Sequence, residues 1–194
     1  MRELRIHGRG GQGAVIASKL LASALFLEGR YVQSFPAFGV ERRGAPVTAF
    51  LRVSDRPILL RCEILLPDDL IVLDPTLVQA VDVTAGLKAG GSILINSERP
   101  PESYVELAGR FRVGTVNASA IATSQGLGSK TQPIVNTAIL GAFAAFWGLV
   151  SLESVCAAIA DEIPVRAEDN VAAAREAARL LRASAAAPPE ALRV

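Results

Sequence analysis

Two short segments carry residue types that bind anions. The first is Gly8-Arg9-Gly10-Gly11-Gln12-Gly13, a GxGxxG pattern between a predicted strand and a predicted helix. Glycines allow a tight turn and let an anion approach without meeting a Cβ atom, and the next helix presents unpaired N–H groups and its positive dipole end. Arg9 and Gln12 add a cation and an amide donor. The loop predicts an anion or phosphate site; a glycine turn that only packs helix against sheet is the alternative.

The sequence after this loop bears on whether the anion is a dinucleotide. In a Rossmann unit, an acidic residue at the end of the second strand binds the ribose diol. Here the predicted second strand ends at Gln33-Ser34-Phe35 without a carboxylate, and the chain then enters a loop rather than a second crossover helix. An NAD site is therefore disfavoured, whereas NADP stays open because an arginine can replace the acid.

The second segment, Phe38-Gly39-Val40-Glu41-Arg42-Arg43-Gly44-Ala45-Pro46, places two guanidinium groups and one carboxylate between glycines. Arginine presents a planar fork that binds phosphate or carboxylate through two hydrogen bonds. Arg42 and Arg43 are therefore candidate anion ligands. The alternative pairs either arginine with Glu41 or Asp74 as a structural ion pair, and one arginine can serve in each role.

Other polar residues have plainer interpretations. Asn136 precedes a predicted helix, where its amide can accept a backbone N–H two or three residues on, so capping competes with ligand contact. His7 has no Ser, Cys or carboxylate partner at suggestive spacing and is expected to be structural or a loop contact. Cys62 and Cys156, with one histidine, supply neither a usual iron–sulfur ligand set nor a zinc site, so no metal is expected on this chain.

The hydrophobic pattern predicts the elements that position these residues. Short alternating or continuous apolar runs predict strands at 4–7, 31–35, 47–53, 58–61, 70–73, 92–95 and 111–116. Helical spacing predicts helices at 14–28, 76–87, 136–149, 152–163 and 169–183. The turn at 54–57 favours a hairpin between 47–53 and 58–61. The expected fold is a three-layer α/β/α sandwich with a mixed, mostly parallel sheet and a Rossmann-like glycine turn after the first strand.

Length and composition limit the class of protein. The 194 residues fit a single domain, 1–183, followed by an Ala- and Pro-rich tail, 184–194. With 51% hydrophobic and 20% charged residues, apolar surface is expected to be buried against partners. A net charge of +1 gives no global field for nucleic acid. No apolar stretch approaches the ~20 residues of a membrane span, and the N-terminus lacks a secretory pattern, so a cytoplasmic protein is expected.

Four motifs then occur in an order typical of one family. The glycine loop and the arginine loop are followed by Leu73-Asp74-Pro75-Thr76 and by Pro133-Ile134-Val135-Asn136-Thr137-Ala138-Ile139-Leu140-Gly141-Ala142-Phe143. Together these motifs resemble the gamma subunit of pyruvate:ferredoxin oxidoreductase and related 2-oxoacid:acceptor oxidoreductases. The resemblance covers almost the whole chain, to about residue 181.

This resemblance implies a multi-subunit enzyme that oxidatively decarboxylates a 2-oxoacid, such as pyruvate or an aryl 2-oxoacid, to acyl-CoA and CO2. It implies that thiamine diphosphate, Mg2+ and [4Fe-4S] clusters lie on alpha, beta and ferredoxin-like delta subunits, which pass electrons to ferredoxin or NAD. The gamma chain then contributes no catalytic residue of its own. It is expected to contribute to subunit assembly and to CoA binding, through the glycine loop, Arg42, Arg43 and Asn136.

Two alternatives stay open at this point. The chain is either a noncatalytic scaffold of the same complex, touching no ligand, or a stand-alone NADP-binding reductase supported by the glycine loop and nearby arginines. The sequence does not identify the 2-oxoacid, the electron acceptor or the stoichiometry, because the resemblance assigns those choices to partner subunits.

Overall fold

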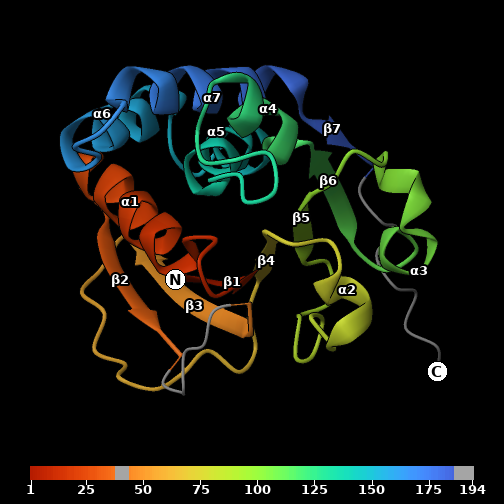
Figure 1. The fold of residues 1–194 in the computed structure, drawn as a ribbon. Helices are drawn as coiled ribbons and strands as arrows, with labels where there is room; N and C mark the ends of the chain where they lie inside the picture. The colour runs from red at the N-terminus through yellow and green to blue at the C-terminus, as the bar shows by residue number, and fades with distance from the viewer. Residues whose placement is uncertain (38–43, 186–194) are drawn as a thin grey trace, which may run out of the picture.

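A seven-stranded β-sheet runs through residues 1–37 and 44–185, the part of the chain that the computed structural model describes (Figure 1). The predicted tail therefore lies outside the described residues from residue 186 onward. The strands lie in the order β2-β3-β1-β4-β5-β6-β7. Along the chain they are β1 (Arg2–Arg9), β2 (Tyr31–Pro36), β3 (Pro46–Ser54), β4 (Asp69–Val72), β5 (Ser92–Asn96), β6 (Arg112–Val116) and β7 (Arg182–Ala183).

The strand directions make the sheet mixed. Neighbours β1, β4, β5 and β6 are parallel, whereas β3 runs antiparallel to both β1 and β2, and β7 runs antiparallel to β6. Thus β1, β2, β4, β5 and β6 all point the same way. Residues 70–72 and 93–95 are completely buried, which explains their continuous apolar sequence. The predicted mixed, mostly parallel sheet is confirmed.

Helices cover both faces of the sheet, so the predicted three layers are also confirmed (Figure 1). None of the helices in the described residues is both long and apolar enough to cross a membrane. A smaller core on one face lies under α2 (Leu77–Ala80), the 3-10 helix η1 (Pro101–Ser103) and α3 (Val105–Ala108). The larger core on the other face lies under α1 (Ala14–Leu27), α4 (Ala118–Ser124), α5 (Asn136–Trp147), α6 (Leu152–Glu162) and α7 (Ala167–Leu180).

The predicted strand at 58–61 is wrong, because these residues form no strand. Both edges of β3 are already paired, one with β1 and the other with β2, so no edge is left for a hairpin partner. The antiparallel part of the sheet comes from β3 itself. The loop after β3 instead exposes four leucines, Leu59, Leu60, Leu65 and Leu66.

The predicted helix at 76–87 is much shorter than expected. Helix α2 ends at Ala80 because Val81 has an extended backbone, with φ −141° and ψ 155°. Asp82 then forms its own turn, in which its carboxylate accepts from the Thr84 N–H at 3.1 Å and from the Thr84 hydroxyl at 2.9 Å. The sequence prediction missed α3, α4, η1 and β7, whereas the other predicted elements are present with small shifts at their ends.

Helix α5 carries Asn136 at its start, and its position depends on a close crossing with α7. A Cβ atom built on Gly141 would overlap the carbonyl oxygen of Ala174 in α7. The α5 residues on either side of this contact, Leu140 and Ala142, are completely buried. A residue without a side chain therefore permits the approach of the two helices.

Gly141→Ala is expected to destabilise the fold, because the added methyl group has no space between α5 and α7. Overpacking a core costs about 1–3 kcal/mol, partly offset here by the ~1 kcal/mol that alanine gains over glycine within a helix. Because the overlap is with a backbone carbonyl, the cost lies at the upper end of this range, and after the offset we expect the free energy of unfolding in urea to fall by about 2 kcal/mol. The control is Gly109→Ala, at a residue with φ −71° and ψ −18° that alanine adopts readily. Equal stability of the two variants would contradict the close crossing.

Candidate functional site

The glycine loop lies between two neighbouring strands, β1 and β4, whose connections lead to opposite sides of the sheet. It follows the carboxyl end of β1, and Asp74 follows the carboxyl end of the neighbouring strand β4. From β1 the chain passes through α1 to β2 on one side of the sheet, and from β4 it passes to β5 on the other side. Ligands of open α/β sheets bind at such a switch point, outside the carboxyl ends of the strands.

The start of α1 presents backbone donors without a capping group. Its N-cap residue, Gly13, is in the left-handed conformation with φ 78° and ψ 32°, has no capping side chain, and is followed by no acidic residue in the first turn. The helical hydrogen bonds begin with the Ala17 N–H donating to Gly13 O at 2.8 Å. The N–H groups of Ala14, Val15 and Ile16 therefore have no acceptor within the helix and point out of its N-terminal end. This end of α1 suits an anion.

At three positions of the loop, the backbone conformation or the close packing favours glycine over a residue with a side chain. Gly11 is exposed at the loop tip with φ 100°, a conformation that a side chain rarely adopts. A Cβ atom on Gly8 would lie 3.3 Å from the side chains of both Ala14 and Leu73, so this glycine lets α1 pack close to the sheet. At Gly13 a Cβ atom would lie 2.5 Å from the amide nitrogen of Asn136. Gly8 therefore serves to pack the helix against the sheet. Gly11 and Gly13 instead give the loop its left-handed turns before the uncapped start of α1.

Arg9, Gln12, Asp74 and Thr76 form a side-chain network, here called the glycine-loop network. The Arg9 guanidinium donates to Asp74 Oδ2 at 3.0 Å, to Thr76 Oγ1 at 2.8 Å and to Gly44 O at 3.1 Å. The Gln12 amide accepts from the Arg9 N–H at 2.8 Å and donates to Asp74 Oδ2 at 3.1 Å. Arg9 and Gln12, which were predicted from the sequence to bind an anion, thus stabilise the conformation of the loop. Within the described part of the chain, two of the five guanidinium N–H groups of Arg9 are left for another partner.

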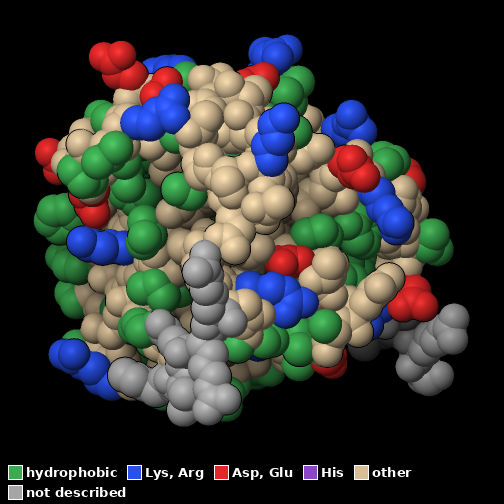
Figure 2. All heavy atoms as spheres, in the orientation of Figure 1, with side chains coloured by type: hydrophobic (Ala, Val, Ile, Leu, Met, Phe, Trp, Pro, Cys, Tyr) green, Lys and Arg blue, Asp and Glu red, His purple; other side chains and the backbone are tan. Residues whose placement is uncertain are grey.

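Asp74 stays ionised in this network. Burial alone would raise the pKa of Asp74, but hydrogen bonds from Thr76 and Gln12 and the charge of Arg9 outweigh it and hold the pKa below its usual value. The carboxylate therefore neutralises much of the Arg9 charge near neutral pH. Among the described groups, the backbone N–H groups of α1 are therefore the main source of positive potential at the site. On the face that Figure 2 shows, the described basic and acidic side chains are interspersed, so they form no broad positive surface. An anion would therefore be attracted by the groups at the site itself.

The described end of the arginine segment lies directly beside the glycine loop. The Gly10 N–H donates to Ala45 O at 2.9 Å, and the Gly44 N–H donates to Gly10 O at 3.1 Å. Arg42 and Arg43 themselves lie outside the described residues, so their roles stay predictions. Asp74, one of their two predicted ion-pair partners, bonds to Arg9 and Gln12.

Asn136 reaches the site from a distant part of the chain. The predicted capping geometry is wrong, because α5 begins at Asn136 with Val135 as its N-cap, and Asn136 Oδ1 accepts from the adjacent Thr137 N–H at 2.9 Å. The residue is 97% buried beside Gly13, since only 3% of its surface is exposed. Among the described residues, its amide nitrogen donates to no acceptor. An amide donor of a buried residue, unused within the described part of the chain, therefore lies next to the open end of α1.

His7, the last buried side chain before the glycine loop, is held neutral. Burial, together with the charge of Arg5, lowers the pKa of His7 to about 4, although a hydrogen bond to the Val83 carbonyl opposes both effects. His7 Nε2 accepts from the Arg5 guanidinium at 3.0 Å, as expected for a neutral ring. This environment supports the structural role predicted for His7 from the sequence.

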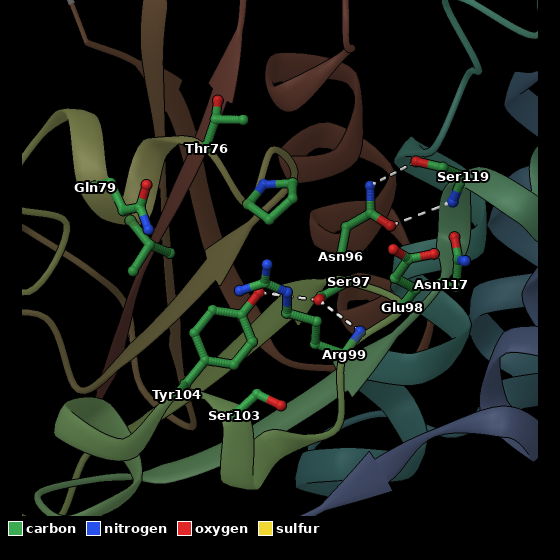
Figure 3. A pocket seen from close by; sticks show the side chains of 12 residues that line it. Thr76, Gln79, Asn96, Ser97, Glu98, Arg99, Ser103, Tyr104, Asn117 and Ser119 are labelled. Carbon is green, nitrogen blue, oxygen red and sulfur yellow. Dashed lines mark hydrogen bonds between the residues drawn. The ribbon is translucent and has the colours of Figure 1, made fainter.

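The sequence analysis missed a cavity beyond β4, β5 and β6 (Figure 3). It is lined by polar side chains at the ends of buried strands, including Asn96 as the last residue of β5, Ser97 after β5 and Asn117 after β6. Tyr104 joins them from the start of α3. The signal that would have revealed these residues is a polar residue placed immediately after an apolar run, because parallel strands end at a common edge.

Comparison with known proteins adds family relationships to this geometry. Residues 3–180 match the family model described as pyruvate ferredoxin/flavodoxin oxidoreductase. The chain is 52% identical over 180 residues to the pyruvate/ketoisovalerate oxidoreductases common subunit gamma of Pyrococcus abyssi, covering 91% of this chain and 95% of that protein. It is 47% identical over 178 residues to pyruvate synthase subunit PorC of Methanocaldococcus jannaschii, covering 92% and 95% of the two chains.

Solved structures share the fold. The crystal structure of pyruvate oxidoreductase subunit PORC from Thermotoga maritima superposes with a TM-score of 0.81 and 33% identity, covering 95% of this chain and 98% of that one. The 2-oxoglutarate:ferredoxin oxidoreductase from Magnetococcus marinus, solved with 2-oxoglutarate, coenzyme A and succinyl-CoA, superposes with a TM-score of 0.72 at 18% identity. The match covers 92% of this chain but 30% of that longer chain, and it shows a common fold.

The contact between Gly13 and Asn136 predicts a measurable coupling. Gly13→Ala is expected to lower the free energy of unfolding by about 1–2 kcal/mol from the left-handed backbone alone, plus a further cost from overlap with the Asn136 amide. In an Asn136→Ala background the overlap is absent, so the same substitution should cost less. Urea unfolding of both single variants and the double variant measures the difference. If Gly13→Ala lowers the free energy of unfolding by the same amount in both backgrounds, the added methyl group does not contact the Asn136 amide.

Proposed function

This chain belongs to the pyruvate ferredoxin/flavodoxin oxidoreductase family as a gamma subunit, and we propose that it binds the phosphates of CoA at the start of α1. The family membership makes it one subunit of a multi-subunit 2-oxoacid:ferredoxin oxidoreductase complex. Other subunits complete the enzyme.

The proposed overall reaction converts a 2-oxoacid, CoA and two oxidised ferredoxins into an acyl-CoA, CO2, two reduced ferredoxins and a proton. Pyruvate is the proposed 2-oxoacid because the relatives from P. abyssi and M. jannaschii both carry pyruvate in their names. Thiamine diphosphate, Mg2+ and [4Fe-4S] clusters are proposed to reside on alpha, beta and delta partners. CoA supplies the thiol that accepts the acyl group.

The open donors at the start of α1 carry the CoA proposal. The N–H groups of Ala14, Val15 and Ile16 are uncapped, and the first turn of α1 holds no carboxylate that would repel a phosphate. The amide nitrogen of the buried residue Asn136 adds a donor beside Gly13. These groups fit a pyrophosphate, which needs several donors in a small volume. Arg9 contributes less than the sequence suggests, because Asp74 and Thr76 hold it.

The exposed leucines after β3 support a further role in assembly. Leu59 and Leu65 are 86% and 73% exposed, although Gln33 and the buried Arg52 fix the loop between them through hydrogen bonds to Leu60 O and Glu63 O. A rigid loop that presents leucines to solvent fits a subunit contact. Scaffolding and CoA binding are compatible roles. A stand-alone NADP reductase is not proposed, because the family membership places the chain in a complex.

Val15→Asp is expected to separate ligand binding from folding. A carboxylate in the first turn of α1 favours the helix by about 0.3–1 kcal/mol but repels a phosphate bound to the same N–H groups. Val15 is 37% exposed, so the substitution is tolerated sterically. In the assembled enzyme, assayed without oxygen, we expect the KM for CoA to rise about tenfold, equivalent to about 1.4 kcal/mol, while the KM for the 2-oxoacid stays unchanged.

The matched control is Val15→Asn, which has nearly the same shape as the aspartate without its charge. We expect the KM for CoA to change by less than about twofold in this variant, because only the charge opposes the phosphate. If both variants keep the KM for CoA of the unmodified enzyme, CoA does not bind at α1. If both raise it equally, the effect is steric and the electrostatic role of α1 is excluded.

A further inference from the structure

Helix α1 is apolar on its outer face as well as on the face that packs against the sheet. Lys19 is the one charged residue of this helix. On the outer face, Phe26 and Leu27 are 69% and 60% exposed, and Ile16 is exposed as well. A helix that is apolar on all sides is normally buried on all sides. The outer face of α1 is therefore expected to be covered in the assembled enzyme.

A groove of about 590 Å3 lies between α1 and α6, which pack side by side (Figure 1). Phe26 and Leu27 line this groove together with Val32 of β2. Its other uncharged lining residues are small: Ala22 and Ser23 of α1, and Ala157 and Ala158 of α6. Small side chains along two neighbouring helices allow a third helix to approach closely and to place its own side chains between them. The shape and the composition of the groove therefore fit a helix.

The charged residues that line the groove are one base and two acids, Lys19, Asp161 and Glu162. Lys19 pairs with Glu162 at 3.6 Å. Within residues 1–37 and 44–185, no hydrogen bond or ion pair engages the Asp161 carboxylate, which is left for a basic group. A second copy of this chain would bring an equally acidic groove, and like charges oppose association. The charge of the groove therefore favours a basic partner over a second copy.

We propose that the groove between α1 and α6 binds an amphipathic helix of another subunit of the complex. This helix places apolar side chains, at helical spacing, against Phe26 and Leu27, and a lysine or arginine against Asp161. The surface is separate from the proposed CoA site, because Phe26 lies roughly 18 Å from Ala14 along the axis of α1. Docking in the groove thus leaves the start of α1 open to a ligand.

Hydroxyl-radical labelling of the full chain, alone and assembled with the other purified subunits, measures whether Phe26 and Leu27 are covered. We expect labelling of both side chains to fall at least about fivefold on assembly, because the centre of an interface excludes water. Unchanged labelling in the assembled enzyme overturns the proposal. Protection that is already present in the chain alone, and that disappears on dilution, assigns the groove to a second copy and also overturns it.

Ala157→Arg tests the groove as the binding surface. Ala157 is exposed on α6, and arginine is a good helix former, so the chain keeps its fold while the new side chain fills the groove and repels a basic partner. We expect the affinity for the other subunits, immobilised for surface plasmon resonance, to fall roughly tenfold or more. The matched control is Ala160→Arg, at an exposed α6 residue that does not line the groove, with an expected change below about twofold. Equal losses in the two variants overturn the proposal.

Asp161→Lys tests the charge of the partner without filling the groove. We expect this variant to bind the other subunits roughly tenfold more weakly at low salt, with a smaller loss at high salt, because salt screens the repulsion between exposed charges. Asp161→Glu keeps the charge and is expected to bind within about threefold of the unmodified chain. If Asp161→Lys binds as tightly as the unmodified chain, the occupant of the groove is not basic and the proposal is wrong.

Discussion

The unpaired N–H groups at the start of α1 are the feature on which the rest of the site depends. A helix end leaves donors without partners, and proteins usually satisfy them with a Ser, Thr, Asp or Asn cap or with an acid in the first turn. Here the N-cap is Gly13 in the left-handed conformation, and neither device is present. The donors are therefore available to an external anion, and the glycines keep side chains out of its way. A capping carboxylate would stabilise α1 and close the site.

Much of the surrounding structure serves to hold this helix end in place. Asp74 fixes Arg9 and Gln12 and stays ionised, so the loop is rigid and its arginine charge is largely balanced. Helix α5 brings Asn136 against Gly13, and the absence of a side chain at Gly141 lets α5 pack closely against α7. Thr76 links the loop to the adjoining cavity. Backbone donors, a buried amide and a polar cavity thus meet at one edge of the sheet, although they come from separate parts of the chain.

The sequence predicted those features that depend on local chemistry. The GxGxxG spacing identified the loop and the start of α1, and apolar runs such as 70–73 identified buried parallel strands. Features that depend on distant partners were missed. Nothing near Arg9 in sequence shows that Asp74, 65 residues away, occupies its guanidinium. Nothing near 58–61 shows that both edges of β3 are paired. The cavity residues Ser97 and Tyr104 gain meaning only when the strand ends are assembled.

The most direct measurement is the structure of the assembled enzyme with CoA bound, solved by crystallography or cryo-electron microscopy. If α1 binds the phosphates, pyrophosphate oxygens lie within about 3 Å of the N–H groups of Ala14, Val15 or Ile16, and the Asn136 amide faces them. CoA phosphates held entirely by other subunits, with the start of α1 covered by protein side chains, would contradict the central claim.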